Sequence, residues 1–514
     1  MPEMRALLIG SVRVTPDQPP SDWLLFSAGR VERAGSGDPP RDLVDTCDVI
    51  RLPAGAVAVP VLHDAHVHLL GTGLMELGVD VSAASGIDEV LALIEEGLRG
   101  FDGPLLRAHS FDPGTLTVSR YPTMKELDAV AGQTPVFVRR RDGHSSAVNR
   151  AAFDLIGLRF DAAGVETDET GGPTGTLRGW AHTTAAATSA DLLTRSERVR
   201  ALHLGAESAL RAGAGVVHVL TGRDDPEDRE IELALEVADE LPIDVVIYPQ
   251  TTDVDRVAAL GLPRIGGCIL LDGSFGSRTA ALSAPYSDAA GNGCLYFDDD
   301  TLTSFVRRAH ARGMQVSLHA IGDRGIRQAV RCITEAVGSE GVAARHRIEH
   351  CELPDAAALA AIAREGIGLC VQPAFERYWG GPGGMYERRL GEERMRATNP
   401  YRTMLDAGIP IGGGSDSYVT PIDPLGGMAA AVDHPTARHR IEPAEALDLF
   451  TRGAAWLAFD EHRVGTLLPG SEASFTVLDR DPVVAEGGAG SVAVLGVYLR
   501  GVRTAPSLES RNSS

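Results

Sequence analysis

The sequence predicts an α/β protein in which a (β/α)8 barrel of the TIM type is joined to a small β-sandwich formed by both termini and to an inserted α/β domain. Three observations lead to this fold class. The middle of the chain alternates short apolar strands with amphipathic helices, both ends consist of short alternating strands broken by glycine and proline, and a long segment separates the first two barrel strands. A chain of 514 residues is too long for one simple domain, which agrees with a barrel that carries additional units.

Eight candidate strands account for the barrel. Between them lie segments with apolar residues at i, i+3 and i+4, which is typical of helices that cover one face of a sheet. Regular alternation of strand and helix favours parallel pairing. The candidate strands are residues 57–69, 214–220, 244–249, 266–273, 315–320, 345–351, 366–373 and 409–416.

The domain boundaries follow from these patterns. Residues 1–58 together with 462–514 are predicted to form the β-sandwich, and residues 59–74 together with 200–461 the barrel. The remaining segment, 75–199, has strands and helices of its own and is far longer than a βα connection. Because this segment follows the carboxyl end of the first strand, we expect it over the mouth of the barrel, where it would shape a substrate pocket.

Charge and composition narrow the kinds of partner. The net charge is −22 and is spread along the chain, which argues against a nucleic acid or an anionic membrane as partner, since both require a concentrated basic surface. The sequence has no apolar run long enough to span a membrane, no signal peptide at its start, and six cysteines without a CxxC pair. We therefore expect a cytoplasmic protein that acts on a small molecule, with a homodimer kept as one option.

The strongest chemical signal is the segment HDAHVHL at the end of the first candidate strand. His66 and His68 are two residues apart, so in a strand their side chains point to the same face. Two imidazoles on one face at the carboxyl end of a barrel strand can bind one metal ion with little rearrangement. A pair of surface histidines is the alternative, and the residues that end the later strands weaken it.

Three later residues fall at the ends of other candidate strands: His319 on the fifth, His350 on the sixth and Asp416 on the eighth, after a glycine run. Taken singly, each histidine could be a buried core residue and the aspartate a helix cap. Taken together they converge on one point, because the carboxyl ends of all barrel strands meet at the same face. The sequence therefore predicts a metal held by His66, His68, His319 and Asp416, with His350 beside it as a further candidate ligand.

The chain also carries longer sequence motifs that are specific in their order and spacing. They are DGHSSAVNRAAFDLIG (142–157), GGPTGTL (171–177), LDGSFGSRTAALSAPY (271–286), HAIGDR (319–324), RHRIEHC (345–351), SDSYVTPIDPL (415–425) and VGTLLPGSEASFTVLDRDP (464–482).

In these motifs the sequence resembles the amidohydrolase superfamily, and within it the amidohydrolase-3 group that includes the N-substituted formamide deformylases. The resemblance implies a barrel with a β-sandwich from both termini and cleavage of an amide-type C–N bond, for example in an N-formyl or N-acyl amine. It also makes His144, in the first of these motifs, a candidate catalytic residue in the pocket.

One departure from the family pattern bears on the metal. The family pattern has a lysine four residues before an Asp-Gly pair on the fourth strand, where its carboxylated form commonly bridges two metals. Here Asp272-Gly273 is present but the position four earlier is Cys268, and the only lysine of the chain, Lys125, lies in the inserted segment. Without such a bridge two nearby cations would repel each other, so we predict one metal ion per chain, with zinc as the first choice. Cys268 is then either a small buried neighbour or, as a thiolate, a ligand itself.

These residues suggest a mechanism. A bound divalent metal lowers the pKa of its water toward neutrality, and Asp416 accepts the water's proton and later delivers it to the leaving nitrogen. His350 would position the water or polarise the scissile carbonyl, and His144 is a candidate donor to the oxyanion. Two alternatives stay open: hydrolytic deamination of a heterocycle or amidine at the same site, distinguished by release of ammonia, and a non-catalytic protein that retains the fold.

Overall fold

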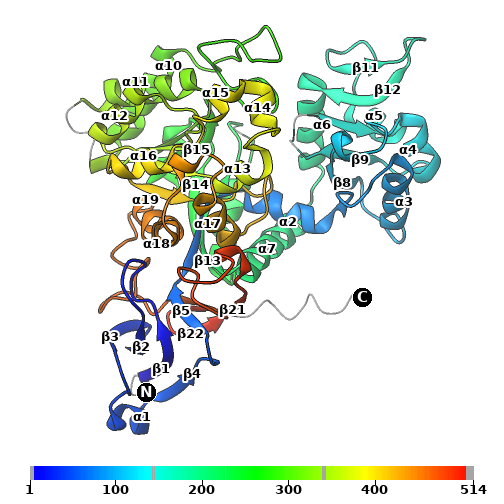
Figure 1. The fold of residues 1–514 in the computed structure, drawn as a ribbon. Helices are drawn as coiled ribbons and strands as arrows, with labels where there is room; N and C mark the ends of the chain where they lie inside the picture. Colours follow the sequence, from blue (N-terminus) through cyan, green and yellow to red (C-terminus); the bar gives the residue numbers. More distant parts are fainter. Residues whose placement is uncertain (1–4, 142, 144, 226, 339–342, 505–514) are drawn as a thin grey trace. The chain divides into compact units, whose positions relative to one another are not determined.

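The computed structural model describes residues 5–141, 143, 145–225, 227–338 and 343–504 (Figure 1). The chain divides into two compact units, Met1–Leu69 with Ala206–Ser514 and Leu70–Gly205. Each unit has its own sheets and its own core. Among the described residues, no helix is both long enough and apolar enough to cross a membrane.

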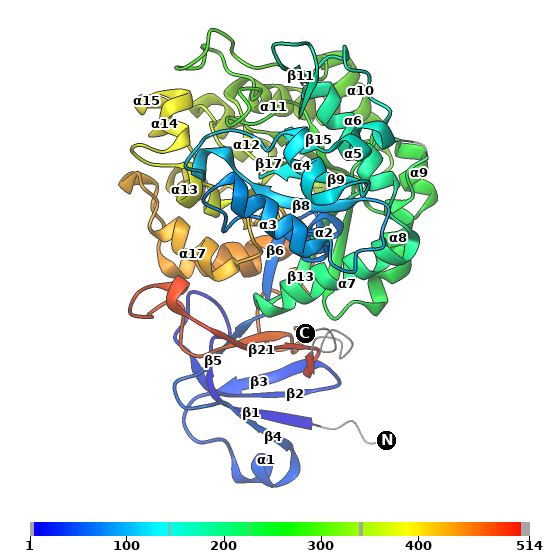
Figure 2. The same ribbon diagram turned by 90° about the vertical axis from the view of Figure 1, so that its right-hand side faces the viewer.

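Strands from both ends of the chain lie in one eight-stranded sheet of the first unit (Figure 2). They are β1 (Arg5–Val12), β2 (Ser21–Ser27), β3 (Arg30–Gly35), β4 (Asp48–Arg51), β5 (Val57–Pro60), β20 (Phe475–Leu478), β21 (Val494–Leu499) and β22 (Val502–Thr504). The order is β22-β21-β20-β5-β1-β2-β3, with β4 paired to β1, and the antiparallel pair of β5 and β20 joins the two ends of the chain. Neighbouring side chains enter different apolar clusters, since Leu8 packs with Phe26 and Phe475 whereas Leu7 packs with Leu43 of helix α1 (Arg41–Thr46).

Eight further strands form the centre of this unit: β6 (Leu62–Val67), β13 (Ala214–Thr221), β14 (Asp244–Pro249), β15 (Arg264–Leu270), β16 (Gln315–Ala320), β17 (Arg347–His350), β18 (Gly368–Val371) and β19 (Ile411–Gly413). They pair in parallel as two sheets, β14-β13-β6 and β15-β16-β17-β18-β19. Hydrogen bonds also connect β6 with the segment after β19. The Asp416 N–H donates to His66 O at 2.8 Å and the His68 N–H to Ser417 O at 2.7 Å.

The prediction of one first strand over residues 57–69 is wrong in its extent. β5 pairs with β20 in the terminal sheet, whereas β6 pairs with β13. Between them the Val61 N–H donates to Ser474 O at 3.0 Å. One apolar run therefore serves two sheets, because periodicity does not reveal where a buried strand changes its partner. The other seven candidate strands overlap with β13 to β19.

Amphipathic helices bury their apolar faces against the parallel strands. In α11 the buried residues Ile326, Ala329 and Ile333 recur at helical spacing and pack in one cluster with Leu318 of β16 and Ile348 of β17. The helices of this unit are α8 (Glu230–Val237), α9 (Val254–Ala259), α10 (Asp299–Ala311), α11 (Asp323–Val337), α12 (Ala356–Glu365), α13 (Pro373–Trp379), α14 (Met385–Leu390), α15 (Glu392–Met395), α16 (Tyr401–Asp406), α17 (Pro424–Val432), α18 (Pro443–Asp448) and α19 (Ala454–Leu457).

The second unit is built on a six-stranded sheet in the order β11-β12-β10-β9-β8-β7. Consecutive residues of β9 enter different cores, since Phe137 packs with Phe153 and Leu177 whereas Val138 packs with Ile94 and Leu127. Its strands are β7 (Val79–Asp80), β8 (Leu106–Phe111), β9 (Val136–Arg140), β10 (Ser145–Val148), β11 (Val165–Thr167) and β12 (Pro173–Arg178), and its helices are α3 (Ile87–Gly97), α4 (Met124–Ala131), α5 (Arg150–Ile156) and α6 (Gly179–Asp191). Helices α2 (Leu69–Leu77) and α7 (Arg195–Arg211) cross the unit boundaries.

Candidate metal centre

Two histidines at the carboxyl end of β6 lie close to the same carboxylate oxygen. His66 Nε2 lies 3.2 Å and His68 Nε2 lies 3.3 Å from Asp416 Oδ1. The ligand atoms of the three residues lie within 4.8 Å of one another. The structure thus brings together three of the four residues expected to hold the metal.

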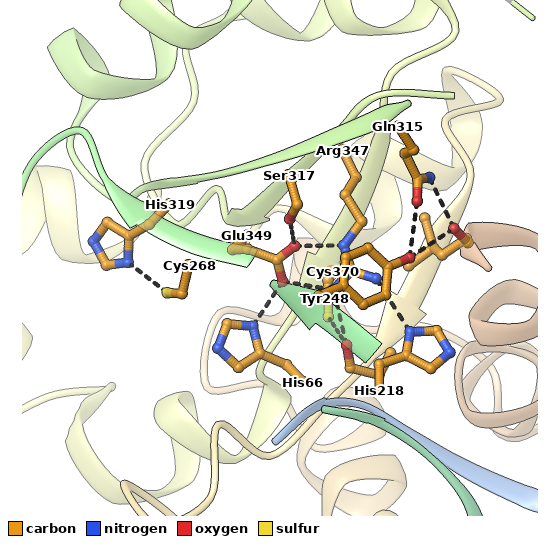
Figure 3. Close-up of polar contacts among 12 residues, drawn as sticks. His66, His218, Tyr248, Cys268, Gln315, Ser317, His319, Arg347, Glu349 and Cys370 are labelled. Atoms are coloured by element: carbon orange, nitrogen blue, oxygen red, sulfur yellow. Dashed lines mark hydrogen bonds and ion pairs between the residues drawn. The ribbon is translucent and has the colours of Figure 1, made fainter. Parts of the chain in front are cut away.

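The fourth expected ligand, His319, lies beside Cys268. The Cys268 sulfur is 3.5 Å from His319 Nδ1, a contact drawn in Figure 3, and 3.7 Å from His350 Nε2. Cys268 lies on β15, and His319 lies on the neighbouring strand β16. Cys268, His350 and His66 also have ligand atoms within 4.8 Å of one another. Cys268 therefore lies close to the ligand atoms of three imidazoles, which is compatible with both options that the sequence offered, a small buried neighbour or a ligand.

The backbone after β19 reaches the centre because it carries glycine. A Cβ on Gly414 would lie 2.7 Å from His66 N and 2.8 Å from His66 Cβ, so any larger residue would push the two segments apart. Asp64 joins the same segments, since its Oδ1 accepts from the backbone N–H of His66 at 3.2 Å and of Ser415 at 2.9 Å. Asp416 follows with a φ of 55° and His350 has a φ of 71°, which are uncommon for residues with a side chain. The ends of these strands are thus shaped to turn side chains inward.

Hydrogen bonds fix which nitrogen of His66 and of His350 faces the centre. His66 Nδ1 contacts Glu349 Oε2 at 2.6 Å, and His350 Nδ1 contacts Gln372 Oε1 at 2.7 Å. An ionised carboxylate or an amide oxygen can only accept, so each Nδ1 carries the hydrogen and each Nε2 presents a lone pair. This is the tautomer that a metal ligand requires.

The electrostatics of the centre favour positive charge. Burial lowers the pKa of the His68 imidazole, but hydrogen bonds to Asp416 and Cys268 outweigh burial and raise it to about 10. Burial likewise lowers the pKa of His319, and the charge of Cys268 more than offsets this and raises it to about 9. For Asp416 itself burial raises the pKa, but the charge of His66 lowers it well below the usual range. Acceptors face one another here and need a proton or a cation between them.

The residues fit a divalent metal. His66 Nε2 is buried and makes no hydrogen bond of good geometry to any described residue, although it faces Asp416. A buried polar atom in this state calls for a partner that the side chains do not supply. Imidazole nitrogen, carboxylate oxygen and thiolate sulfur are the ligands that zinc accepts.

Several supporting residues escaped the sequence analysis. Arg347, Glu349 and Gln372 are all buried, and none was singled out beforehand. A signal was present, because Arg347 and Glu349 are charged residues two apart in a short strand that is fully buried. His144, the expected pocket donor, lies outside the described residues.

The chain is similar to known proteins over most of its length. The model of the amidohydrolase family matches residues 54–504. The amidohydrolase YtcJ of Bacillus subtilis is 30% identical over 466 residues, which cover 83% of this chain and 85% of YtcJ. The N-substituted formamide deformylase of Arthrobacter pascens is 28% identical over 550 residues, which cover 98% of each chain. Among solved structures, an uncharacterized metal-dependent hydrolase from Pyrococcus horikoshii has a TM-score of 0.79 at 26% identity and covers 95% of this chain and 99% of its own.

Proposed function

This chain belongs to the amidohydrolase family, and we propose that it hydrolyses an amide-type C–N bond in an N-formyl or N-acyl amine with a metal-activated water. The observation that carries the proposal is the convergence of His66, His68 and Asp416 at the carboxyl ends of parallel strands. Similarity to N-substituted formamide deformylase over the whole chain supports the substrate class. The proposal includes closure of the eight parallel strands into one barrel.

The metal would be held by His66, His68, His319 and Asp416, with His350 beside it and Cys268 as a further candidate ligand. When bound, a divalent metal lowers the pKa of its water toward neutrality. We propose one ion per chain, with zinc as the first choice. The short distances from Cys268 to His319 and His350 make the thiolate a candidate ligand of equal standing with the imidazoles.

Asp416 is the proposed general base. Its carboxylate stays ionised because the neighbouring imidazoles hold its pKa low, so it can accept a proton from the nucleophile and return it to the leaving nitrogen. Protonation of that nitrogen is needed because an amide anion is a poor leaving group.

His350 is the proposed positioning group for the scissile carbonyl. Its Nδ1 is held by Gln372, and the ring of Phe375 stacks on it with the centroids 6.1 Å apart. An imidazole held on two sides keeps its Nε2 in one direction, which is what orientation of a substrate requires. His144 stays a predicted donor to the oxyanion.

The test is a substrate panel on purified protein loaded with zinc. N-formyl and N-acyl amines are expected to yield a carboxylate and an amine in equal amounts. Release of ammonia from heterocycles or amidines instead would support the deaminase that the sequence left open, and turnover of neither class would contradict the proposal. A cytoplasmic location, a homodimer and a placement of residues 75–199 over the barrel mouth stay predictions.

A further inference from the structure

The geometry points to Glu349 as a positioning residue that sets the metal affinity of the centre through His66, with Arg347 holding Glu349 in place. The inference rests on the proposed metal centre and adds a residue pair to it. Both side chains are fully buried, and neither is among the residues proposed to contact the substrate.

Glu349 reaches His66 from another strand. It lies on β17 and its Oε2 is 2.6 Å from Nδ1 of His66 on β6, with both side chains fully buried. This contact, a dashed line in Figure 3, leaves the other ring nitrogen of His66, Nε2, at 3.2 Å from Asp416 Oδ1. A carboxylate that accepts from the far nitrogen of a metal-binding histidine fixes the ring and makes its other nitrogen more basic.

Arg347 fixes the carboxylate in turn. Its Nη2 donates to Glu349 Oε2 at 2.8 Å, and its Nε makes a short contact with the other carboxylate oxygen. Ser317 Oγ donates to that second oxygen as well. Arg347 and Glu349 thus form a fully buried ion pair, and these contacts hold the carboxylate in place behind His66.

The same pair excludes a metal on its own side of the ring. His66, Glu349 and Cys370 also have ligand atoms within 4.8 Å of one another. Arg347 is fully buried beside them, and its Nη2 additionally donates to Ala65 O at 2.9 Å. A second positive charge there would face a buried guanidinium, so the cation belongs at Nε2 of His66.

The support of His350 provides an internal comparison. Gln372 holds Nδ1 of His350 at 2.7 Å, nearly the same distance as Glu349 from His66, but a neutral amide carries no charge. Geometry alone would thus be served by glutamine at either place. The charge of Glu349 is expected to add affinity, because a charged acceptor makes a stronger bond than a neutral one.

The test measures zinc affinity by competition with a chelator, together with the visible spectrum of the cobalt-substituted protein. Glu349→Gln keeps the shape and an acceptor for His66 but removes the charge, and we expect the dissociation constant to rise roughly 10–100-fold. Since this variant leaves Arg347 buried and unpaired, Arg347→Met with Glu349→Gln removes both charges and is expected to show the same loss in a folded protein.

A matched control is Glu472→Gln. Glu472 is also a buried glutamate paired with arginine, its Oε2 lying 3.0 Å from Arg463 Nη1, but it belongs to none of the three candidate ligand groups. The zinc affinity of the Glu472→Gln variant should stay within about twofold of that of the wild type, because distant sites act independently. Unchanged affinity and an unchanged cobalt spectrum in the double variant overturn the inference. A wild-type protein that binds no zinc overturns the proposed function instead.

Discussion

The amino ends and the carboxyl ends of the parallel strands are both buried and polar, but they are built differently. At the amino end of β16, Gln315 donates to Arg345 O at 2.7 Å and to Leu457 O at 2.9 Å, and it accepts from Tyr248 OH at 2.9 Å. Next to it, His346 Nδ1 accepts from the Val316 N–H at 2.9 Å. Each of these hydrogen bonds joins a donor to an acceptor, which is the ordinary way to bury polar groups.

At the carboxyl ends acceptors meet acceptors. Nε2 of His66 and of His68 face one oxygen of Asp416, and the sulfur of Cys268 faces two further imidazoles. The contrast appears in two buried histidines. Burial and the neighbouring His310 lower the pKa of His346 to about 3, whereas the pKa of His319 is raised to about 9. Burial by itself therefore does not mark a site, but an uncompensated set of acceptors does.

Removing the shared acceptor should have the largest effect. Asp416→Asn leaves an amide that fills the same space but cannot accept the proton of the nucleophile. We expect kcat on an N-formyl or N-acyl amine to fall roughly 10²–10⁴-fold with the fold retained. Steady-state kinetics with circular dichroism as the check on folding measures this. Wild-type turnover in the variant would remove Asp416 from the mechanism.

A smaller effect is expected at the amino ends, where the histidine is kept neutral. The folded pKa of His346, about 3, lies below the ordinary 6.5, so between these values the unfolded chain binds a proton that the native protein does not. Stability should therefore fall as the pH drops below 6.5, by about 1.4 kcal/mol per pH unit from this residue.

His346→Asn tests this by keeping an acceptor for Val316 without a group that titrates. The urea midpoint of the variant should change less between pH 7 and pH 5 than that of the wild type. Equal losses on acidification would show that other groups control acid stability. Metal content at pH 7 should be the same in both proteins, because the residue lies at the opposite end of the strands.

Sequence alone revealed the residues that end the strands. The spacing of His66 and His68 and the short candidate strands that end at His319, His350 and Asp416 are local signals, and these strands are present. The partners behind those residues depend on contacts between strands that are distant in sequence. Glu349 meets His66 across 283 positions, and no local pattern specifies that register.

The position of Cys268 shows a second limit. From the sequence, Cys268 could be either a small buried neighbour of the metal or a ligand. In the structure the rings of His319 and His350 lie 4.5 Å apart at their centroids, and both turn a nitrogen toward the sulfur. The orientation of these two rings determines whether their nitrogens face the sulfur. That orientation follows from hydrogen bonds such as that of His350 to Gln372 rather than from sequence spacing.

The metal content of purified protein tests the central claim most directly. Elemental analysis of the wild type should give about one tightly held divalent ion per chain, and His66→Ala with His68→Ala should lose it, since two of its nitrogen ligands are gone. Cys268→Ala shows whether the sulfur is also a ligand, because the ion would then be lost from that variant too. Two tightly held ions would contradict the count of one. A wild-type protein without any ion, or a double variant that keeps it, would contradict a metal centre at the carboxyl ends of these strands.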